Sequence, residues 1–563
     1  MKSSAIIECV PNFSEGRDQA KIQKIEEAIR SVQSVSLLNS DPGKSTNRTV
    51  ITFAGHPEEV IEAAFRAIAV AAQIIDMSTH HGEHPRMGAT DVCPLIPISG
   101  ISLEETSAFA IKLARRVGDE LKIPVYLYEA SSSKPHRQNL ADIRSGEYEG
   151  LEEKMKDQDW IPDFGPAVFN PKTGATVIGA RDFLVAYNVN LSTTSVALAN
   201  EVAFDIRENG RPVRDPVTNK IMKDQQGEPI RTPGMCPSVK AIGWYIDEYH
   251  YAQVSMNLTD IHVTPLHIAF ESCRKAAEKY GLHVTGSELV GLVPKQCLID
   301  AGLYFLKKQK RSCGLSEEEI IQIAIHSLGL NESSVFDPKK RIIEYMLVEK
   351  NQRLANLSLS QFANETASDS PAPGGGSVSA YVGALGASLS TMVANLSLHK
   401  KGFEDKYELF NEQAILGAKL IKTLIDLVDE DTLAFDAIMQ AFRLPKTTVD
   451  EKKIRKKAIR KATIGAIEIP MKTIDAARKI LPVTRMMVEH GNVSSVSDAG
   501  VGALCIETAV RGASMNVKIN AATLENEEDR KKYFDLANQA ESKTIQEVKE
   551  ILSMVETRLL PKN

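Results

Sequence analysis

Two different spacings of apolar residues divide the chain near residue 320. Before that point, short apolar runs typical of buried strands alternate with stretches in which apolar side chains recur every three or four positions, as on one face of a helix. Beyond the change only the helical spacing is found, over 376–400, 405–441, 451–479, 495–518 and 524–558. The pattern predicts a multi-domain protein in which α/β units precede an all-helical domain.

The first part, residues 4–130, has the segment order of a ferredoxin-like fold. Strands are expected at AIIECV, VSLLN, RTVITFAG, DVCPLIPIS and PVYLYEA, and helices at 19–32, 57–75 and 102–121. The order β-α-β-β-α-β is the split βαβ motif, here extended by one helix and one strand. The loop SDPGKSTN, residues 40–47, is expected to join the second and third strands.

Residues 183–308 repeat this order without visible sequence similarity. The expected segments are a strand at 183–191, a helix at 194–208, a hairpin at 240–259, a helix at 264–281, a strand at 284–294 and a helix at 295–308. We therefore expect a second ferredoxin-like α/β unit. A charged, proline-rich insert at 209–237 is expected to form a surface hairpin or a lid.

These patterns define the expected domain boundaries. They place two α/β subdomains at 1–180 and 181–325, a linker at 326–356 and the helical domain at 357–563. Two breaks interrupt the helical domain, SDSPAPGGGS at 368–377 and HGNVSSVSDAG at 490–500. Functional residues of that domain are expected in these breaks.

The composition narrows the class of protein. The chain has 563 residues, of which 43% are hydrophobic and 25% charged, as in soluble globular proteins, and its net charge of -6 does not favour nucleic acid as a partner. No apolar run looks long enough to span a membrane, and the N-terminus lacks the apolar core of a signal peptide. The seven cysteines are scattered and form no CxxC motif, which predicts reduced thiols and a cytoplasmic location.

The stretch STHHGEHPRMGATD, residues 78–91, concentrates ionisable side chains. His80 and His84 have the spacing of two zinc ligands on a helix, but Gly82 and Pro85 oppose a helix and no HExxH motif is present. An ordinary polar loop and a proton-transfer site are the two stronger alternatives. The second is chemically reasonable because histidine titrates near neutral pH and the neighbouring charges can set its protonation state.

Several motifs, in order along the chain, resemble those of two enzyme families. ECVPNFSEG at 8–16, STNRTV at 45–50, GEHPRMGATDVCP at 82–94, DFGP at 163–166 and GARDFLVAYNVNL at 179–191 resemble glutamate formiminotransferase. SPAPGGGSVSA at 370–380, LVDEDTLAFDAIM at 427–439 and GNVSSVSDAGVGA at 491–503 resemble formiminotetrahydrofolate cyclodeaminase. Together they resemble the bifunctional formiminotransferase-cyclodeaminases of histidine breakdown. The resemblance does not cover the insert or the connection near 325–355.

For the transferase half, the resemblance implies that His84 takes the proton from nitrogen 5 of tetrahydrofolate as this nitrogen attacks the formimino carbon. Asp41 would support His84, or is an ordinary turn aspartate. Arg86 would bind a substrate carboxylate, or forms a structural ion pair.

The resemblance also implies a folate-binding loop, in which glycine and proline let the backbone approach the pterin and one aromatic ring offers a stacking face. The alternative is a plain inter-domain linker. The loop consists of Gly165, Pro166, Ala167, Val168, Phe169, Asn170, Pro171, Lys172, Thr173 and Gly174.

For the helical half, the resemblance implies that Asp431 donates the proton with which ammonia departs. Its acidic neighbours Asp429 and Glu430 are expected to raise its pKa, although a solvated acidic turn is the alternative. A loop at a helix start would wrap an anion or a flat ring, and consists of Gly374, Gly375, Gly376 and Ser377. The basic run KKIRKKAIRK, 452–461, either is simply solvated or holds the polyglutamate tail of a folate.

The function that the resemblance implies has two steps. The formimino group passes from N-formimino-L-glutamate to tetrahydrofolate, and the product is cyclised to 5,10-methenyltetrahydrofolate with release of ammonia. Tetrahydrofolate is the one-carbon acceptor, and no metal or nucleotide is expected. We expect a homo-oligomer assembled through the helical domain, without nucleic acid or membrane as partner. The alternatives are a glutamate formyltransferase fused to a methenyltetrahydrofolate cyclohydrolase, and a non-catalytic folate-binding scaffold.

Overall fold

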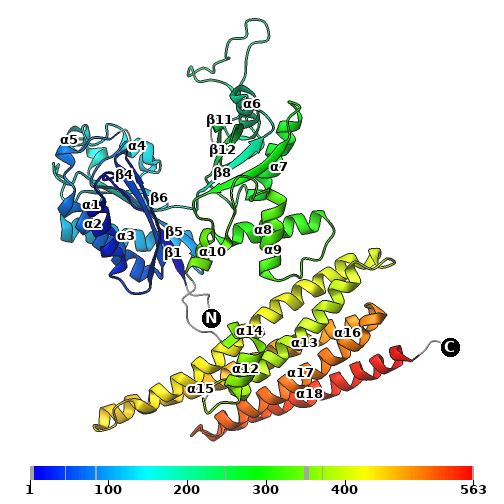
Figure 1. Cartoon of the computed structure of the whole chain (residues 1–563). Helices are drawn as coiled ribbons and strands as arrows, with labels where there is room; N and C mark the ends of the chain where they lie inside the picture. Colours follow the sequence, from blue (N-terminus) through cyan, green and yellow to red (C-terminus); the bar gives the residue numbers. More distant parts are fainter. Residues whose placement is uncertain are drawn as a thin grey trace. The chain divides into compact units, whose positions relative to one another are not determined.

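The computed structural model describes residues 5–44, 46–82, 85–246, 249–347, 354–370 and 372–560 (Figure 1). The chain forms two compact units that are interleaved along the sequence. The first unit combines residues 1–301 with 325–349, and the second combines 302–324 with 350–563. Each unit is described by itself.

A seven-stranded sheet forms the start of the first unit. Its strands are β1 (Ile6–Cys9), β2 (Asn12–Phe13), β3 (Val35–Gly43), β4 (Arg48–Gly55), β5 (Thr90–Ser99), β6 (Val125–Glu129) and β7 (Thr176–Ala180). β1 and β2 pair antiparallel with both β4 and β5, and β3 pairs with β4. This is the expected ferredoxin-like order. The extension has two strands instead of the one expected, because β7 inserts between β5 and β6 and runs parallel to both.

Alternation along the strands gives the sheet two different faces. Three helices, α1 (Gln19–Arg30), α2 (Pro57–Ile74) and α3 (Leu103–Leu121), share one apolar core with the sheet residues Ile51 and Phe53 of β4. Since successive side chains of a strand point to opposite sides, Arg48, Val50 and Thr52 lie on the other side. We call this side, opposite α1, α2 and α3, the second face of the sheet.

One expected loop is instead part of a strand. Residues 40–43 were expected in a loop, but Ser40 to Gly43 continue the pairing of β3 with β4, and Asp41 lies opposite Val50. β3 pairs only with β4 and is therefore an edge strand, where Pro42 costs no ladder hydrogen bond. Asp41 is thus a strand residue on the second face, and the turn-aspartate alternative is wrong.

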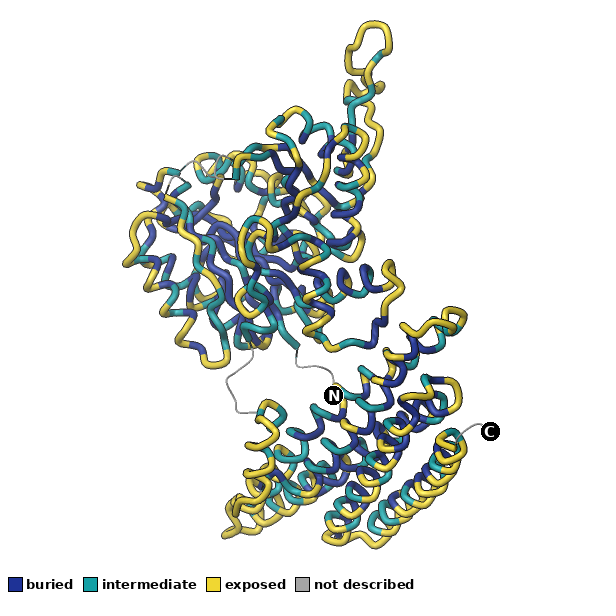
Figure 2. Tube along the Cα trace, turned by 45° about the vertical axis from the view of Figure 1, so that its right-hand side comes forward, coloured by how far each residue is buried: buried dark blue, intermediate teal, exposed yellow. Residues whose placement is uncertain are grey.

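The second part of the first unit is a four-stranded antiparallel sheet. The strands β8 (Val185–Leu191), β11 (Val239–Ile246), β12 (Tyr251–Leu258) and β13 (Val284–Val290) lie in the order β11-β12-β8-β13, with helices α6 (Val196–Ile206) and α7 (Leu266–Glu278). The expected repeat of the β-α-β-β-α-β order is confirmed. The insert forms a hairpin on the short strands β9 (Arg211–Pro212) and β10 (Arg231–Thr232), and its tip is exposed (Figure 2).

The expected linker at 326–356 is largely wrong. Residues 325–347 belong to the first unit, where Leu328, Ile342 and Ile343 are fully buried and Ser287 N donates to Gly329 O at 3.0 Å. Their helices are the end of α9 (Glu317–Leu328), then α10 (Pro338–Arg341) and α11 (Ile343–Met346). The sequence pattern missed this because the buried residues are separated by short turns and show no regular period.

The second unit is helical, as expected. Its helices are α12 (Leu359–Thr366), α13 (Gly375–Leu398), α14 (Tyr407–Arg443), α15 (Val449–Lys479), α16 (Leu481–His490), α17 (Val496–Ala521) and α18 (Glu527–Leu559). α12 was not expected, and α16 was not expected as a separate helix; α16 follows α15 directly, with Pro482 in its first turn. Small residues let α13 and α17 approach closely: a side chain at Gly386 would begin 2.9 Å from the carbonyl oxygen of Gly502.

The expectation that no apolar run is long enough to span a membrane is wrong for two helices. Among the described residues, Gly375–Leu398 and Val493–Ala521 pass that test by length and composition. The most apolar window of the first is 61% buried inside the unit and that of the second 50%, as core helices of a bundle are. Length and composition alone therefore do not distinguish a membrane-spanning helix from a core helix of the bundle in this chain.

Candidate active sites

The histidine-rich loop of the first unit is held by the turn that precedes β4. Asn47 Nδ2 donates to His81 O at 3.0 Å, and His80 Nε2 lies 2.9 Å from Asn47 O. A side chain at Gly82 would begin 2.2 Å from the carbonyl oxygen of Thr46, so only glycine fits there. The motif STNRTV thus fixes the backbone up to residue 82. His84, the expected proton-transfer residue, and Glu83 lie outside the described residues.

Arg86 is saturated by protein groups. Its guanidinium donates to Glu149 through both terminal nitrogens, at 2.6 and 2.9 Å, and to Glu147 at 3.1 Å. Its Nε also donates to Nδ1 of the buried His80 at 3.4 Å. This geometry favours the ion-pair alternative for Arg86 over binding of a substrate carboxylate.

His80 is a neutral, structural histidine. It accepts from Arg86 at Nδ1, so the proton on its ring is at Nε2, which donates to Asn47. Burial lowers the pKa of His80, with a smaller contribution from the charge of Arg86. No group of three or more His, Cys, Asp and Glu side chains that could hold a metal is found among the described residues. The absence of a metal stays a prediction, because part of the motif lies outside them.

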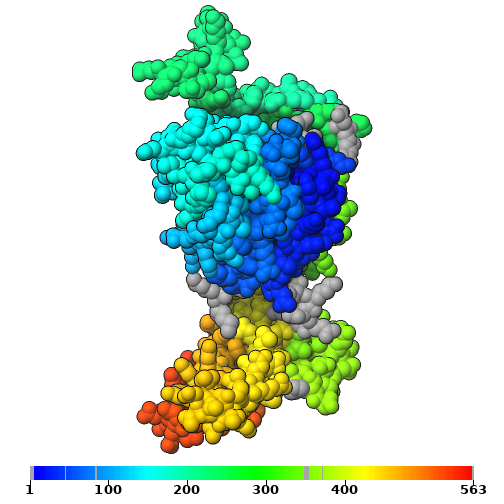
Figure 3. Space-filling view, turned by 90° about the vertical axis from the view of Figure 1, so that its left-hand side faces the viewer, coloured from blue at the N-terminus to red at the C-terminus, as the bar shows by residue number. Residues whose placement is uncertain are grey.

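The expected folate-binding loop lies directly beside this histidine loop. Met77 N donates to Lys172 O at 2.9 Å, Ala89 N to Thr173 O at 2.8 Å and Ala175 N to Met87 O at 3.1 Å. Figure 3 shows the same neighbourhood on the surface, where the cyan segment around residues 130–175 adjoins the blue segments of the first hundred residues. The structure therefore brings together two motifs that are about eighty residues apart in the sequence.

Within residues 165–174, glycine lets the backbone approach a neighbouring segment closely, and the one aromatic ring already packs against another ring of the protein. Gly174 has a φ of +62°, and a side chain there would begin 2.1 Å from Met87 O. Phe169 packs against Tyr148 with ring centroids 5.4 Å apart. Asn170 Oδ1 accepts from the backbone of Lys172 and Thr173 and fixes the turn. Val168, at 67% exposure, is the most solvent-accessible large apolar residue of the loop.

Asp431 is a residue of α14 in the second unit, and its carboxyl group lies beside the first turn of α13. Ser377 Oγ is 3.0 Å from Asp431 Oδ2 and also 3.0 Å from Val428 O, and a side chain at Gly376 would begin 2.1 Å from Asp431 Oδ1. The protein's own carboxylate thus lies at this glycine-rich helix start, and binding of substrate by Gly374, Gly375, Gly376 and Ser377 stays a prediction. Gly376 and Ser377 hold Asp431, which the sequence pattern did not reveal.

The pKa of Asp431 is raised, but not for the expected reason. The main cause is burial of the carboxyl group, and the hydrogen bonds from the Ser377 side chain and backbone partly oppose it. The acidic neighbours are not among the causes: Asp429 accepts from Leu354 N at 2.7 Å and Glu430 forms an ion pair with Lys472 at 3.4 Å. A raised pKa favours the protonated form of a carboxyl group, which is the form that donates a proton.

The two breaks of the helical unit lie at opposite ends of α13. Residue Gly374 precedes the first turn of this helix, whereas Asn492 N of the second break donates to Ser397 Oγ in its last turn, at 2.9 Å. Ser377 and Ser397 are twenty residues apart, about 30 Å along the axis. The expectation that both breaks carry functional residues is therefore supported only for the first.

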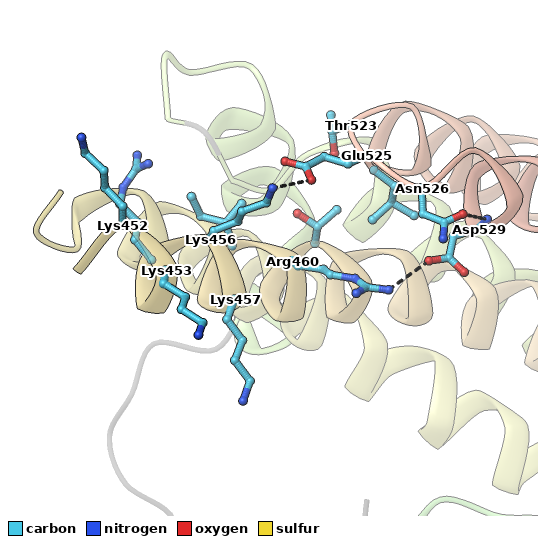
Figure 4. A pocket seen from close by; sticks show the side chains of 13 residues that line it. Lys452, Lys453, Lys456, Lys457, Arg460, Thr523, Glu525, Asn526 and Asp529 are labelled. Carbon is cyan, nitrogen blue, oxygen red and sulfur yellow. Dashed lines mark hydrogen bonds and ion pairs between the residues drawn. The ribbon is translucent and has the colours of Figure 1, made fainter. Parts of the chain in front are cut away.

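A cavity of about 830 Å³ lies along the basic run of α15 (Figure 4). We call it the basic groove. Lys456 reaches Glu525 at 2.8 Å and Arg460 reaches Asp529 at 3.2 Å, while Lys453 and Lys457 point away from these carboxylates. Among the described residues no ion pair involves Lys452, Lys453 or Lys457. The basic groove is lined by Lys452, Lys453, Arg455, Lys456, Lys457, Ile459, Arg460 and Thr463 of α15 and by Thr523, Leu524, Glu525, Asn526 and Asp529.

Two α/β subdomains followed by a helical unit, with a separate candidate site in each part, define a two-site enzyme. The chain belongs to the formiminotransferase-cyclodeaminase family. Residues 6–181 match "Formiminotransferase domain, N-terminal subdomain", residues 186–348 match "Formiminotransferase domain" and residues 358–539 match "Formiminotransferase-cyclodeaminase". The match to residues 186–348 agrees with the placement of residues 325–347 in the first unit, but it also spans 302–324, which the structure groups with the helical unit and not with the expected subdomain 181–325.

Similar proteins support this membership. The chain is 44% identical over 519 residues to a formimidoyltransferase-cyclodeaminase of Mus musculus, covering 92% of each chain. It is 41% identical over 302 residues to a glutamate formimidoyltransferase of Streptococcus pyogenes, covering 54% of this chain and 93% of that protein. It is 34% identical over 171 residues to a methenyltetrahydrofolate cyclohydrolase of Methylorubrum extorquens, covering 30% of this chain and 82% of that protein.

Proposed function

We propose that the chain transfers the formimino group from N-formimino-L-glutamate to tetrahydrofolate and then cyclises 5-formiminotetrahydrofolate to 5,10-methenyltetrahydrofolate and ammonia. The observation that carries this proposal is the match to a two-activity relative over 92% of both chains. The folate is consumed and returned in modified form, so it is a substrate. The reaction as written needs no metal and no nucleotide.

In the transfer step, nitrogen 5 attacks the formimino carbon and loses its proton, and the glutamate nitrogen must gain one as it leaves. A single imidazole can carry out both transfers in sequence, and His84 is the residue we assign to this role. The placement of residues 165–174 beside residues 77–89 supports binding of the pterin next to that imidazole.

In the cyclisation step, nitrogen 10 attacks the same carbon, the carbon–nitrogen bond to the former imino nitrogen breaks, and this nitrogen leaves as ammonia. The departing amine must be protonated. We assign the donation of this proton to Asp431, because its carboxyl group is half-buried and its pKa is raised. Ser377 and Gly376 keep the carboxyl group at the start of α13.

We further propose that the folate carries a polyglutamate tail, which binds in the basic groove, and that copies of the chain assemble through the helical unit in the cytoplasm. The repeated carboxylates of such a tail suit a run of lysines, three of which have no ion pair among the described residues. The groove begins at Thr463, about 14 Å along α15 from Lys472, which contacts the neighbour of Asp431. A tail held there would keep the intermediate near the protein between the two steps.

The test separates the two activities. Wild type, His84→Ala, Asp431→Asn and the matched control Glu430→Gln are assayed for glutamate release, ammonia release and the absorbance of the methenyl product. We expect His84→Ala to lose all three signals. Asp431→Asn should release glutamate normally but form methenyl product about 100- to 10,000-fold more slowly. A wild type that forms methenyl product from formylglutamate without releasing ammonia would favour the formyltransferase–cyclohydrolase alternative instead.

A further inference from the structure

Arg48 carries a guanidinium group that has no protein counter-ion. It is the first residue of β4 and lies on the second face of the sheet. Its Nε is enclosed and has no hydrogen-bond partner, and in the part of the chain that the structure describes no side-chain hydrogen bond or ion pair of Arg48 is found. Burial lowers its pKa, the charge of Asp91 opposes this shift, and the charge of Arg144 adds to it. A half-buried guanidinium without a hydrogen-bond partner is stabilised by a bound anion.

The carboxylates nearest to Arg48 do not neutralise it. Asp91 is 1% exposed and already accepts from the Arg144 guanidinium and, at 3.0 Å, from Met87 N. Asp41, on the same face of the neighbouring strand, is exposed and makes only a minor electrostatic contribution at Arg48. Among the described residues, neither carboxylate therefore forms an ion pair with Arg48, and its guanidinium can accept an incoming anion.

This cation lies next to the histidine loop. The residue before it, Asn47, is the one that holds His80 and His81. A cavity of about 480 Å³ is lined by His81, Gly82, Arg86 and the segment around Glu147. Arg86, the other arginine of this region, has its donors occupied by Glu147 and Glu149. Arg48, in contrast to Arg86, thus has donors that remain available among the described residues.

We infer that Arg48 binds a carboxylate of the amino-acid donor and is the residue that selects a dicarboxylic donor for the transferase. This inference rests on the proposed function, which supplies a donor with two carboxylates. A guanidinium presents two parallel N–H groups that match a carboxylate, and a lysine cannot reproduce this geometry. Fixing one carboxylate would also hold the formimino carbon in place for attack by the folate nitrogen.

The experiment pairs variants of Arg48 with donors that lack one charge. Full-length wild type, Arg48→Gln, Arg48→Lys and the surface control Arg66→Gln are assayed for transfer from N-formimino-L-glutamate and from its α-amide and γ-amide analogues. We expect Arg48→Gln to lower kcat/KM for the dicarboxylic donor about 10- to 100-fold, mainly through KM. For one of the amides the loss should be less than about 3-fold, and this amide identifies the carboxylate that Arg48 binds. Arg48→Lys should be intermediate, and Arg66→Gln unchanged.

Two measurements distinguish a folding defect from the loss of a carboxylate contact. Cyclisation of 5-formiminotetrahydrofolate supplied directly should be the same in all variants, and their circular dichroism should match the wild type. An equal loss with the dicarboxylic donor and both amides would overturn the assignment of Arg48, as would unchanged kinetics of Arg48→Gln. A wild type that does not transfer from N-formimino-L-glutamate at all would instead overturn the proposed function.

Discussion

At the scale of single residues, Glu8 shows how a strand can force an acid into an unusual state. Ile7 and Cys9 on either side of it are fully buried in the core of the sheet, so strand alternation directs Glu8 to the second face. Glu8 is itself only 2% exposed. Burial raises its pKa to about 8, although the charge of Arg181 opposes the shift. The sequence pattern placed this strand correctly but did not single out its one charged residue.

The raised pKa of Glu8 gives a stability prediction. Folding raises the pKa from 4.5 to about 8, so the folded state binds the proton more tightly and its stability falls as pH rises between these values. We expect the free energy of unfolding of the first unit to drop by about 2–4 kcal/mol from pH 5 to pH 8 on this account. Glu8→Gln should remove that drop, and the exposed control Glu152→Gln should keep it. Urea unfolding at both pH values measures it; identical pH dependence in wild type and Glu8→Gln would contradict the prediction.

The roles of site residues were harder to predict than their identities. Asp431 was expected as a proton donor from its resemblance to a family motif, but its raised pKa was attributed to Asp429 and Glu430. Successive residues on a helix point about 100° apart, so adjacency in sequence does not bring their carboxylates together. The contact that matters joins residues 377 and 431, and no local pattern reveals such a pairing. The role of His84 stays a prediction.

At the scale of elements, length decided what could be predicted. The long helices α13, α14, α15, α17 and α18 were expected within a few residues of their bounds, because many periodic positions agree. The short strands β2 and β7 were not expected, because two to five residues carry no measurable period, and the hairpin expected in the insert was given without strand bounds. Proline and glycine in β3 suggested a loop, yet an edge strand tolerates both.

The basic groove gives the prediction that belongs to this scale. Replacing Lys452, Lys453, Lys456 and Lys457 with glutamine should weaken binding of polyglutamylated tetrahydrofolate and leave the monoglutamate unaffected, because only the longer tail reaches α15. With about 0.2–1 kcal/mol for each of the four exposed contacts, the loss of affinity should be about 4- to 1,000-fold. The matched control neutralises four exposed lysines of α18, Lys531, Lys532, Lys543 and Lys549. The affinities for both folates are measured as dissociation constants at two salt concentrations. Equal losses for both folates would argue against a tail site in the groove.

At the scale of the whole molecule, the helical unit leaves apolar side chains exposed on two of its core helices. These are Leu385, Met392 and Leu396 of α13 and Val501, Leu504, Met515 and Ile519 of α17. Exposed apolar side chains on one unit in this number are typical of an interface between subunits. They support the proposed homo-oligomer, whose size the sequence does not predict.

We therefore expect Leu504→Glu to lower the oligomeric mass of the protein, since a charge at an apolar interface is costly to bury. Light scattering after size-exclusion chromatography measures the mass. The control Leu559→Glu changes an equally exposed leucine at the end of α18 and should leave the mass unchanged. A wild type that is already monomeric would refute the proposed assembly.

The interleaving of the two units has a consequence for how they can be separated. The chain leaves the first unit after residue 301, returns to it at 325 and leaves again after 349. Three covalent crossings therefore connect the two bodies where a simple fusion would have one. A single protease cut near residue 350 would leave them joined, and a gene truncated at codon 301 would encode an α/β body stripped of its closing segment.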